Sequence, residues 1–326
     1  MTPPIRTATL RNELSWGTGS DYSVALLAGF RSEPKTIPCK YFYDQEGSRL
    51  FEKISTLPEY YLTRTELMLL SRHAEELAEW IGPEAEIVEF GAGASTKIRV
   101  LLSALEHPRS YLPVDISATY IKTMAEGVQG DYPGLMVRPV IADFSLGLPS
   151  GVFSSGARRV GFFPGSTIGN LAPAEANKFL VQAAGILAGG GLLIGVDLVK
   201  DPSLLHAAYN DRAGVTAAFN KNLLARANRE GLANFQLQNF AHYAPYNVLH
   251  QRVEMYLVSM VPQRITVLNR PVAIGEGEPI HTEWSYKYTI DGFRALARDA
   301  GFTPRAIWCD ENRLFSLHWL EVPRSF

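Results

Sequence analysis

Acidic residues follow apolar, strand-like segments of the chain at spacings that suit the recognition of a nucleoside. Asp115 comes 24 residues after Gly91, where nucleotide-binding folds place the acceptor for the ribose hydroxyls. Asp143 ends the following segment and Phe144 comes next, so a carboxylate could accept from the exocyclic amine of an adenine while the ring packs on the base. An alternative for Asp115 is a cap on the next helix, although Ser117 is also placed for that task. The pattern therefore favours a site for an adenine nucleoside.

A glycine turn precedes these acids. The apolar run of residues 86–90 breaks at Gly91 and Gly93, and a helical period follows, which is the opening unit of a doubly wound α/β sheet. Position 96 is a threonine, so the third glycine of the dinucleotide fingerprint is missing, and Glu89 stands just before the turn. We therefore favour the glycine loop of an S-adenosylmethionine (SAM) methyltransferase over a site for NAD. An ordinary strand-to-helix turn is the alternative.

The elements that must position these residues alternate between strands and helices. Five segments look like strands and span residues 86–90, 111–117, 136–141, 159–163 and 189–198. Four of them alternate with helices of ordinary length, which predicts an α/β sheet with right-handed crossovers. The alternation stops after Asp201-Pro202, and the stretch 201–286 has a pattern of its own. Because long structureless loops are rare in compact domains, we expect this stretch to build part of a second domain. One more helix, 288–300, and a β-hairpin over 306–322 close the chain.

We thus expect an α/β fold that combines a Rossmann-like SAM methyltransferase sheet with a second, α+β substrate-binding domain. The sheet domain would comprise residues 64–200 and 287–326, and its first helix would span 65–80. The second domain would combine residues 1–63 with 201–286.

Composition excludes several classes of function. The chain has 326 residues with 46% hydrophobic and 20% charged residues, as in ordinary soluble globular proteins. A net charge of −2 lacks the basic footprint of a nucleic-acid-binding protein, so we expect no nucleic-acid partner. Cys39 and Cys309 are far apart and match no metal-ligand spacing, so we expect neither a disulfide framework nor a metal. No apolar run suits a membrane span or a signal peptide, and we expect a cytoplasmic monomer.

Polar and aromatic residues outside the sheet pattern are candidates for a pocket wall. Tyrosines cluster in residues 41–43 and again at Tyr60-Tyr61, both ahead of the first strand. For a single tyrosine, packing at a rim with its hydroxyl in water is the simpler interpretation, but two clusters favour a pocket. Asn170 ends a glycine-containing turn after the strand 159–163, where it offers both a donor and an acceptor. It could instead cap the helix that starts at Pro173.

Several blocks of the chain resemble the histidine Nα-methyltransferases, SAM-dependent enzymes that trimethylate the α-amine of L-histidine to hercynine in the first step of ergothioneine biosynthesis. The resemblance covers nearly the whole chain. It is carried by Tyr41-Phe42-Tyr43-Asp44 with Gly47-Ser48, Leu57-Pro58-Glu59-Tyr60-Tyr61 with Thr63-Arg64-Thr65-Glu66, Glu89-Phe90-Gly91-Ala92-Gly93-Ala94-Ser95, Phe163-Pro164-Gly165-Ser166-Thr167-Ile168-Gly169-Asn170, and Tyr209-Asn210-Asp211 with Thr216-Ala217-Ala218-Phe219-Asn220.

The resemblance implies a role for each matching position. SAM would be held by Gly91, Lys97, Asp115, Asp143, Phe144 and Gly165. The carboxylate of the substrate would be held by Tyr60 or Tyr61, together with Asn170 and Tyr209. The imidazole would be read by Glu283 and Ser285, and its pocket would be lined by Met255. Tyr43 would be the catalytic residue and would lie beside the amine and the transferred methyl group.

Alternatives remain for the substrate and for its readers. A related methyltransferase could act on another amino acid, tyrosine or tryptophan, or on a small amine, and a third hypothesis is a non-catalytic SAM-binding module. Glu283 and Ser285 alternate along a strand-like segment, and such a polar pair commonly faces solvent. The resemblance reverses that preference, and an acidic reader of the ring favours histidine because a site built to hydrogen-bond a polar side chain rejects apolar analogues.

Overall fold

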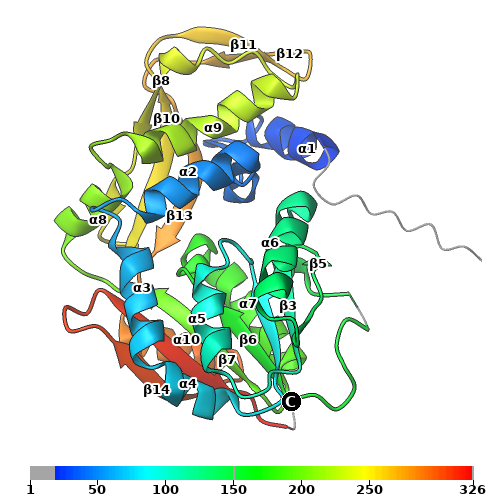
Figure 1. Ribbon diagram of the computed structural model, residues 1–326. Coiled ribbons are helices and arrows are strands. Elements are labelled where there is room, and N and C mark those ends of the chain that lie inside the picture. Colours follow the sequence, from blue (N-terminus) through cyan, green and yellow to red (C-terminus); the bar gives the residue numbers. More distant parts are fainter. Residues whose placement is uncertain (1–18, 150, 325–326) are drawn as a thin grey trace, which may run out of the picture.

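The computed structural model describes residues 19–149 and 151–324, arranged in two lobes (Figure 1). The larger lobe is built on an eight-stranded sheet with the order β14-β15-β7-β6-β2-β3-β4, and β5 also pairs with β3. Its strands are β2 (Glu86–Phe90), β3 (Ser110–Asp115), β4 (Met136–Val137), β5 (Val140–Ile141), β6 (Arg159–Phe163), β7 (Gly191–Asp197), β14 (Thr303–Cys309) and β15 (Phe315–Glu321). The pairings from β4 and β5 across to β7 are parallel, and β15 and β14 add antiparallel strands.

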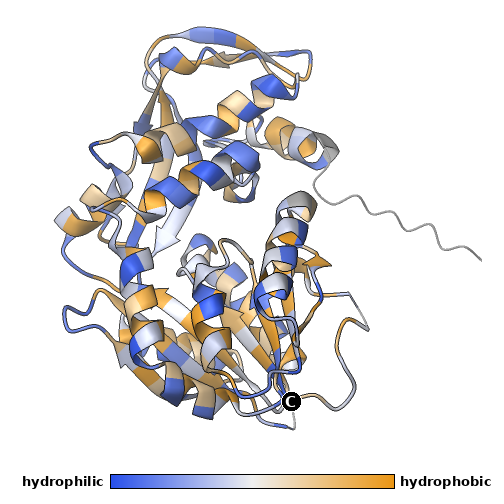
Figure 2. Cartoon of the chain, viewed as in Figure 1, coloured by the Kyte–Doolittle hydropathy of each residue, from blue (hydrophilic) through white to orange (hydrophobic). Residues whose placement is uncertain are grey.

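Helices cover both faces of this sheet, as the alternating pattern predicts. One face carries the apolar residues of α3 (Tyr61–Arg72), α4 (Ala74–Ile81), α5 (Thr96–Ala104) and α6 (Ala118–Asp131). The other face packs on α7 (Pro173–Ile186) and α10 (Ile290–Asp299). All residues of β2 and β7 are buried, and β7 is apolar along most of its length, as expected for a strand covered on both faces; the sheet of this lobe is largely orange in Figure 2. The prediction of an α/β methyltransferase-type sheet is confirmed.

Strand order brings the candidate nucleoside residues to one edge. β2 lies between β3 and β6, and the chain reaches these two neighbours in opposite directions across the sheet. Ligands of such sheets bind outside the carboxyl ends of the strands at this reversal. Phe90 pairs with Val114, so the next residues, Gly91 and Asp115, lie side by side at the ends of neighbouring strands.

The second lobe has its own sheet and its own core. Its strands are β1 (Lys35–Thr36), β13 (Pro279–Tyr286), β10 (Arg252–Ser259), β8 (Phe240–Tyr243) and β9 (Tyr246–Asn247), and a separate hairpin pairs β11 (Gln263–Val267) with β12 (Arg270–Ile274). Its helices are α1 (Gly19–Gly29), α2 (Gln45–Ser55), α8 (Pro202–Tyr209) and α9 (Val215–Arg229). A hydrophobic core joins residues from Tyr22 to Leu62 with residues from Leu205 to Ile280. We propose that the two lobes are the domains 64–200 with 287–326 and 1–63 with 201–286; the first 18 residues lie outside the described chain.

The chain passes between the lobes in three places, and two of these passages run side by side. Leu198 forms a parallel bridge with Tyr288. The backbone N–H of Tyr288 donates to the carbonyl of Asp197 at 3.0 Å, and that of Val199 donates to the carbonyl of Tyr288 at 3.0 Å. The third passage leads from α2 into α3 at Tyr60-Tyr61.

Two expected elements differ from the structure. The segment 136–141 is not one strand but two short ones, β4 and β5, which pair with β3 at the edge of the sheet on either side of Pro139. The expected helix 65–80 begins earlier, at Tyr61, and is broken at His73 into α3 and α4. The closing hairpin lies where it was predicted, as β14 and β15.

Candidate active site

The glycine turn after β2 folds back over the end of β3. The backbone N–H groups of Gly91 and Ala92 both donate to the carbonyl of Val114 at 2.9 Å. Gly91 has a φ of +70°, and the Cβ of any other residue there would lie 3.3 Å from the ring of Phe144. This position therefore requires glycine for its backbone conformation and for space.

Asp115 stands at the end of β3 with one carboxylate oxygen engaged. Its Oδ1 accepts from the backbone N–H of Ser117 at 2.7 Å, so it does organise the turn into α6. Burial raises the pKa of Asp115 to about 6, partly opposed by hydrogen bonds from the backbone of Ser117 and Ile116. The second carboxylate oxygen is the one that could accept from a ribose hydroxyl.

Asp143 and Phe144 follow β5 at the same edge. Asp143 accepts from the N–H of Ser145 at 3.0 Å and from the ammonium of Lys40 at 3.1 Å, and Lys40 comes from the other lobe. Although burial opposes it, these hydrogen bonds hold the pKa of Asp143 below its ordinary value. The ring of Phe144 packs edge-on against Phe163 and Phe179, with centroids 5.4 and 5.5 Å away.

A buried carboxylate that the sequence interpretation missed connects Lys97 with Gly165. Glu66 on α3 is fully buried, and its Oε2 lies 2.6 Å from the Nζ of Lys97. Both of its oxygens also accept from the backbone N–H of Gly165 at 2.9 Å. Gly165 has a φ of +78°. The signal was present in the block Thr63-Arg64-Thr65-Glu66, but nothing local to that block indicates which turn the carboxylate reaches.

Glu283 and Ser285 point into the protein. They lie two residues apart on β13 and are 8% and 4% exposed, so the alternative of a solvent-facing pair is wrong. Met255 on β10 is the cross-strand partner of Glu283 and is 2% exposed. On the opposite face of β13, the guanidinium of Arg252 stacks over Trp284 and Tyr286. The structure thus brings Met255, Glu283 and Ser285 to one face of the sheet.

Asn170 reaches the same place from the other lobe. It ends η3 (Thr167–Asn170), and its Nδ2 lies 3.4 Å from Oε2 of Glu283. The alternative that Asn170 caps α7 is wrong, because the residue before that helix is Ala172, whose N–H donates to Glu175. The structure therefore joins residues assigned to the two ends of a substrate.

The two adjacent tyrosines have different surroundings. The hydroxyl of Tyr61 donates to the carboxylate of Asp197 at 2.9 Å and accepts from Lys200 at 2.7 Å. The ring of Tyr60 instead lies edge-on to that of Tyr209, with centroids 6.3 Å apart. This difference separates two residues that the sequence left equivalent.

Tyr43 completes the aromatic wall. Its ring packs edge-on against Phe51 and Phe219, at centroid distances of 5.7 and 5.8 Å. Burial, reinforced by the negative charge of Glu283, raises the pKa of Tyr43 well above its ordinary value. The pKa of Tyr60 is likewise raised, by burial first and then by Tyr209 and Glu283. These phenols are therefore neutral hydrogen-bonding groups at physiological pH.

Burial also changes Glu283 itself. It raises the pKa of this carboxyl to about 7, and the positive charge of Lys287 opposes the shift only in part. A folded-state pKa above the unfolded value of 4.5 means that the folded protein binds the proton more tightly. The corresponding stability is fully present below the unfolded pKa and is lost as the pH rises through the folded pKa.

We therefore expect Glu283→Gln to become relatively more stable as the pH rises. Between about pH 5 and about pH 8.5, the free energy of unfolding of the variant should gain about 2 to 3 kcal/mol on that of the wild type, the amount that a shift of this size represents. Urea unfolding of both proteins at the two pH values measures the difference. Parallel stability curves would show that Glu283 ionises as freely in the folded protein as in the unfolded chain.

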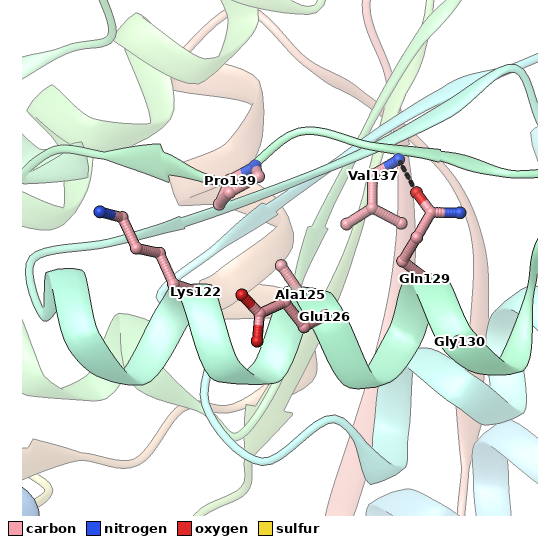
Figure 3. A pocket seen from close by; sticks show the side chains of 7 residues that line it. All are labelled: Lys122, Ala125, Glu126, Gln129, Gly130, Val137 and Pro139. Atoms are coloured by element: carbon pink, nitrogen blue, oxygen red, sulfur yellow. Dashed lines mark hydrogen bonds between the residues drawn. The ribbon is translucent and has the colours of Figure 1, made fainter.

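Two surface hollows lie away from these residues. The hollow in Figure 3 has a volume of about 440 Å³ and is lined by α6 and the β4–β5 segment, through Lys122, Ala125, Glu126, Gln129, Gly130, Val137 and Pro139. A second, of about 620 Å³, lies against β8, β10 and the start of β13. Neither contains any of the candidate residues.

The described residues offer neither a cluster suited to a metal ion nor a helix suited to a membrane. Residues 19–149 and 151–324 include no group of three or more His, Cys, Asp or Glu side chains arranged to hold a metal ion. Within the same ranges, every helix is too short or too polar to cross a bilayer.

Comparison with known proteins adds independent findings. Residues 22–322 match the family model described as "Histidine-specific methyltransferase, SAM-dependent". A histidine N-alpha-methyltransferase of Mycolicibacterium smegmatis is 40% identical over 296 residues, covering 89% of this chain and 91% of that protein. Ergothioneine biosynthesis protein 1 of Neurospora crassa is 29% identical over 301 residues, which are 89% of this chain and 34% of that one. The 4-dimethylallyltryptophan N-methyltransferase ifgB of Penicillium roqueforti is 25% identical over 320 residues, covering 90% and 92% of the two chains.

Proposed function

Because this chain belongs to the family of histidine-specific, SAM-dependent methyltransferases, we propose that it trimethylates the α-amine of L-histidine to hercynine, the first step of ergothioneine biosynthesis. The observation that carries the proposal is Glu283, a buried carboxyl on the substrate lobe that lies beside Asn170 and opposite Met255. A buried acid needs a polar partner, and an imidazole N–H is such a partner.

The edge formed by β2, β3, β5 and β6 fits SAM. We assign Asp115 to the ribose, Asp143 and Phe144 to the adenine, and the turns at Gly91 and Gly165 to close approach of the backbone, with Lys97 at the end of the site. The support is the shared edge, the positive φ of both glycines and the remaining acceptor on Asp115. When bound, SAM supplies an activated methyl group.

The substrate lobe fits a small amino acid held by its two ends. We assign the carboxylate to Tyr60, Asn170 and Tyr209, and the imidazole to Glu283 and Ser285 beside Met255. We prefer Tyr60 to Tyr61 because the hydroxyl of Tyr61 is already engaged by Asp197 and Lys200. Substrate contacts at both ends leave the amine free to turn between successive methylations.

The residues around the amine have to position it and leave its lone pair unoccupied. Alignment of the amine with the reacting methyl group can lower the activation barrier by several kcal/mol. The amine must lose its proton before each round, and Tyr43 stays protonated because its pKa is raised. We therefore propose that water takes up the proton of the amine and that Tyr43 encloses and orients the amine.

We also propose that the protein is a cytoplasmic monomer.

A related tryptophan-type specificity is the second candidate, and the relative from Penicillium roqueforti carries such a name. Histidine is favoured over it because the chain is 40% identical to a histidine N-alpha-methyltransferase but 25% identical to this tryptophan-type relative. The experiment that separates the two is mass spectrometry of the purified protein with SAM and an equimolar mixture of all proteinogenic amino acids. Histidine alone should gain methyl groups; methylation of another amino acid would contradict the proposed substrate, and no methylation at all would favour a non-catalytic module.

A further inference from the structure

A lysine that neither the sequence interpretation nor the proposed function uses lies behind the substrate residues. Lys287 follows β13, is 2% exposed, and sits where the chain returns to the larger lobe. Its Nζ lies 2.7 Å from Oδ2 of Asp197, 2.9 Å from the hydroxyl of Tyr209 and 2.8 Å from the hydroxyl of Ser285. An ammonium has three protons, so each one has a partner among these three oxygens.

These contacts determine how the two hydroxyls can behave. The oxygens of Tyr209 and Ser285 are 2.7 Å apart, so one hydroxyl donates to the other while both accept from Lys287. Two hydroxyl protons are available, and the bond between the oxygens uses one of them. The remaining O–H must point away from the lysine. The pair therefore offers one hydrogen-bond donor, which suits an anionic group on a ligand.

The charge of this cluster is also suited to an anion. Asp197 is fully buried and contacts two ammonium groups, those of Lys287 and Lys200, with Lys200 at 2.5 Å. Of these two, Lys287 is the one that also contacts Tyr209 and Ser285, so its positive charge lies nearest to the residues assigned to the substrate. A free amino acid brings a carboxylate, and a charge in a weakly polar site is stabilised by a nearby opposite charge.

The cluster also joins the three passages between the lobes. Tyr61 belongs to the passage from α2 into α3, Asp197 and Lys200 to the passage that follows β7, and Lys287 to the passage that follows β13. Tyr209, which is assigned to the substrate, is hydrogen-bonded to one charged residue of this junction, Lys287. A side chain anchored at the junction is held by both lobes, as a positioning residue must be.

We propose that Lys287 is a positioning residue for the carboxylate of the substrate: anchored by Asp197, it holds the hydrogen-bonded pair of Tyr209 and Ser285 so that the hydroxyl proton of Tyr209 points toward that carboxylate, and it supplies compensating positive charge. The inference rests on the proposed function, since it needs an amino acid substrate held near Tyr209. It places Lys287 one contact away from the substrate.

The test compares ligands with and without the carboxylate. Calorimetry in the presence of S-adenosylhomocysteine gives the Kd of L-histidine and of histamine, which keeps the imidazole and the amine. We expect Lys287→Met to weaken L-histidine by about 30-fold, the loss typical of a hydrogen-bonded charge, and to change the Kd of histamine by less than about threefold. S-adenosylhomocysteine affinity should be unchanged.

Lys200→Met is the matched control. Lys200 shares Asp197 with Lys287 and is buried at the same junction, but it contacts Tyr61 and not Tyr209. We expect it to change the Kd of L-histidine by less than about threefold, because the Tyr209–Ser285 pair keeps its lysine. In the double variant Tyr209→Phe with Lys287→Met, the affinity for L-histidine should fall by less than the product of the two single fold-losses. If Lys287→Met does not unfold cooperatively, the double variant Asp197→Asn with Lys287→Met removes both charges and should show the same selective loss.

Two results would overturn the inference: wild-type affinity for L-histidine in Lys287→Met, or equal losses for L-histidine and histamine, which indicate a purely structural role. Failure of the proposed function is a separate outcome, because the wild type itself would then bind a different amino acid. The same comparison, with that amino acid and its decarboxylated amine, then decides the role of Lys287.

Discussion

Replacing Glu283 with alanine is expected to lower kcat/KM for L-histidine on the order of 1,000-fold, while the affinity for SAM changes by less than about twofold. The carboxyl is 8% exposed, so its removal leaves a buried imidazole N–H without an acceptor. Sites that hydrogen-bond a polar substrate group lose this much discrimination when the partner is missing. Initial rates with histidine and calorimetry with S-adenosylhomocysteine measure the two quantities.

Glu283→Gln is the control for this experiment, because its amide keeps an acceptor oxygen of nearly the same size. Its loss should be about 10- to 50-fold, as expected when a charge-assisted hydrogen bond becomes a neutral one. An unchanged affinity for S-adenosylhomocysteine shows that the alanine variant is folded. If both variants use histidine as well as the wild type does, Glu283 does not read the substrate.

The second large effect is expected on the cofactor side. Asp115→Ala should weaken S-adenosylhomocysteine about 100-fold, because the free carboxylate oxygen at the end of β3 would no longer accept from the ribose hydroxyls. Asp115→Asn keeps an oxygen acceptor and should lose about tenfold or less. Calorimetry with S-adenosylhomocysteine alone gives both values without requiring any activity.

Asp201→Ala controls for the structural task of Asp115. Asp201 accepts from the N–H of Ser203 at 2.8 Å, just as Asp115 accepts from Ser117 at 2.7 Å, but it precedes α8 in the other lobe. Loss of such a turn contact alone should leave the affinity for S-adenosylhomocysteine within about twofold. A similar loss in the Asp201 and Asp115 variants would assign Asp115 to the turn and contradict its role in binding.

The nucleoside edge was predictable because it follows from a general rule of parallel sheets. Gly91 and Asp115 terminate neighbouring strands, so their proximity needs only the order of the strands and the alternation that the sequence shows. The break at His73 was not predictable, because the apolar period of the sequence continues through it.

The buried charges were beyond reach of the sequence for a different reason. Glu66 faces Gly165, and Lys287 faces Asp197, only because the fold brings segments about 90 or more residues apart in the sequence together. Neither carboxylate is part of a local motif that names its partner, and a lysine after a strand is ordinarily a solvated residue. Likewise, Tyr60 and Tyr61 differ only through Asp197, which lies in another part of the sequence. Such pairs depend on tertiary contacts and on no periodicity.

The most direct test of the account is mass spectrometry of the product formed from L-histidine with excess SAM, including fragmentation that locates each methyl group. We expect a final product with three methyl groups, all on the α-nitrogen and none on the ring. Methyl groups on the imidazole would mean that the substrate lies in the opposite orientation, with Glu283 near the amine, and would contradict the assignment of the site.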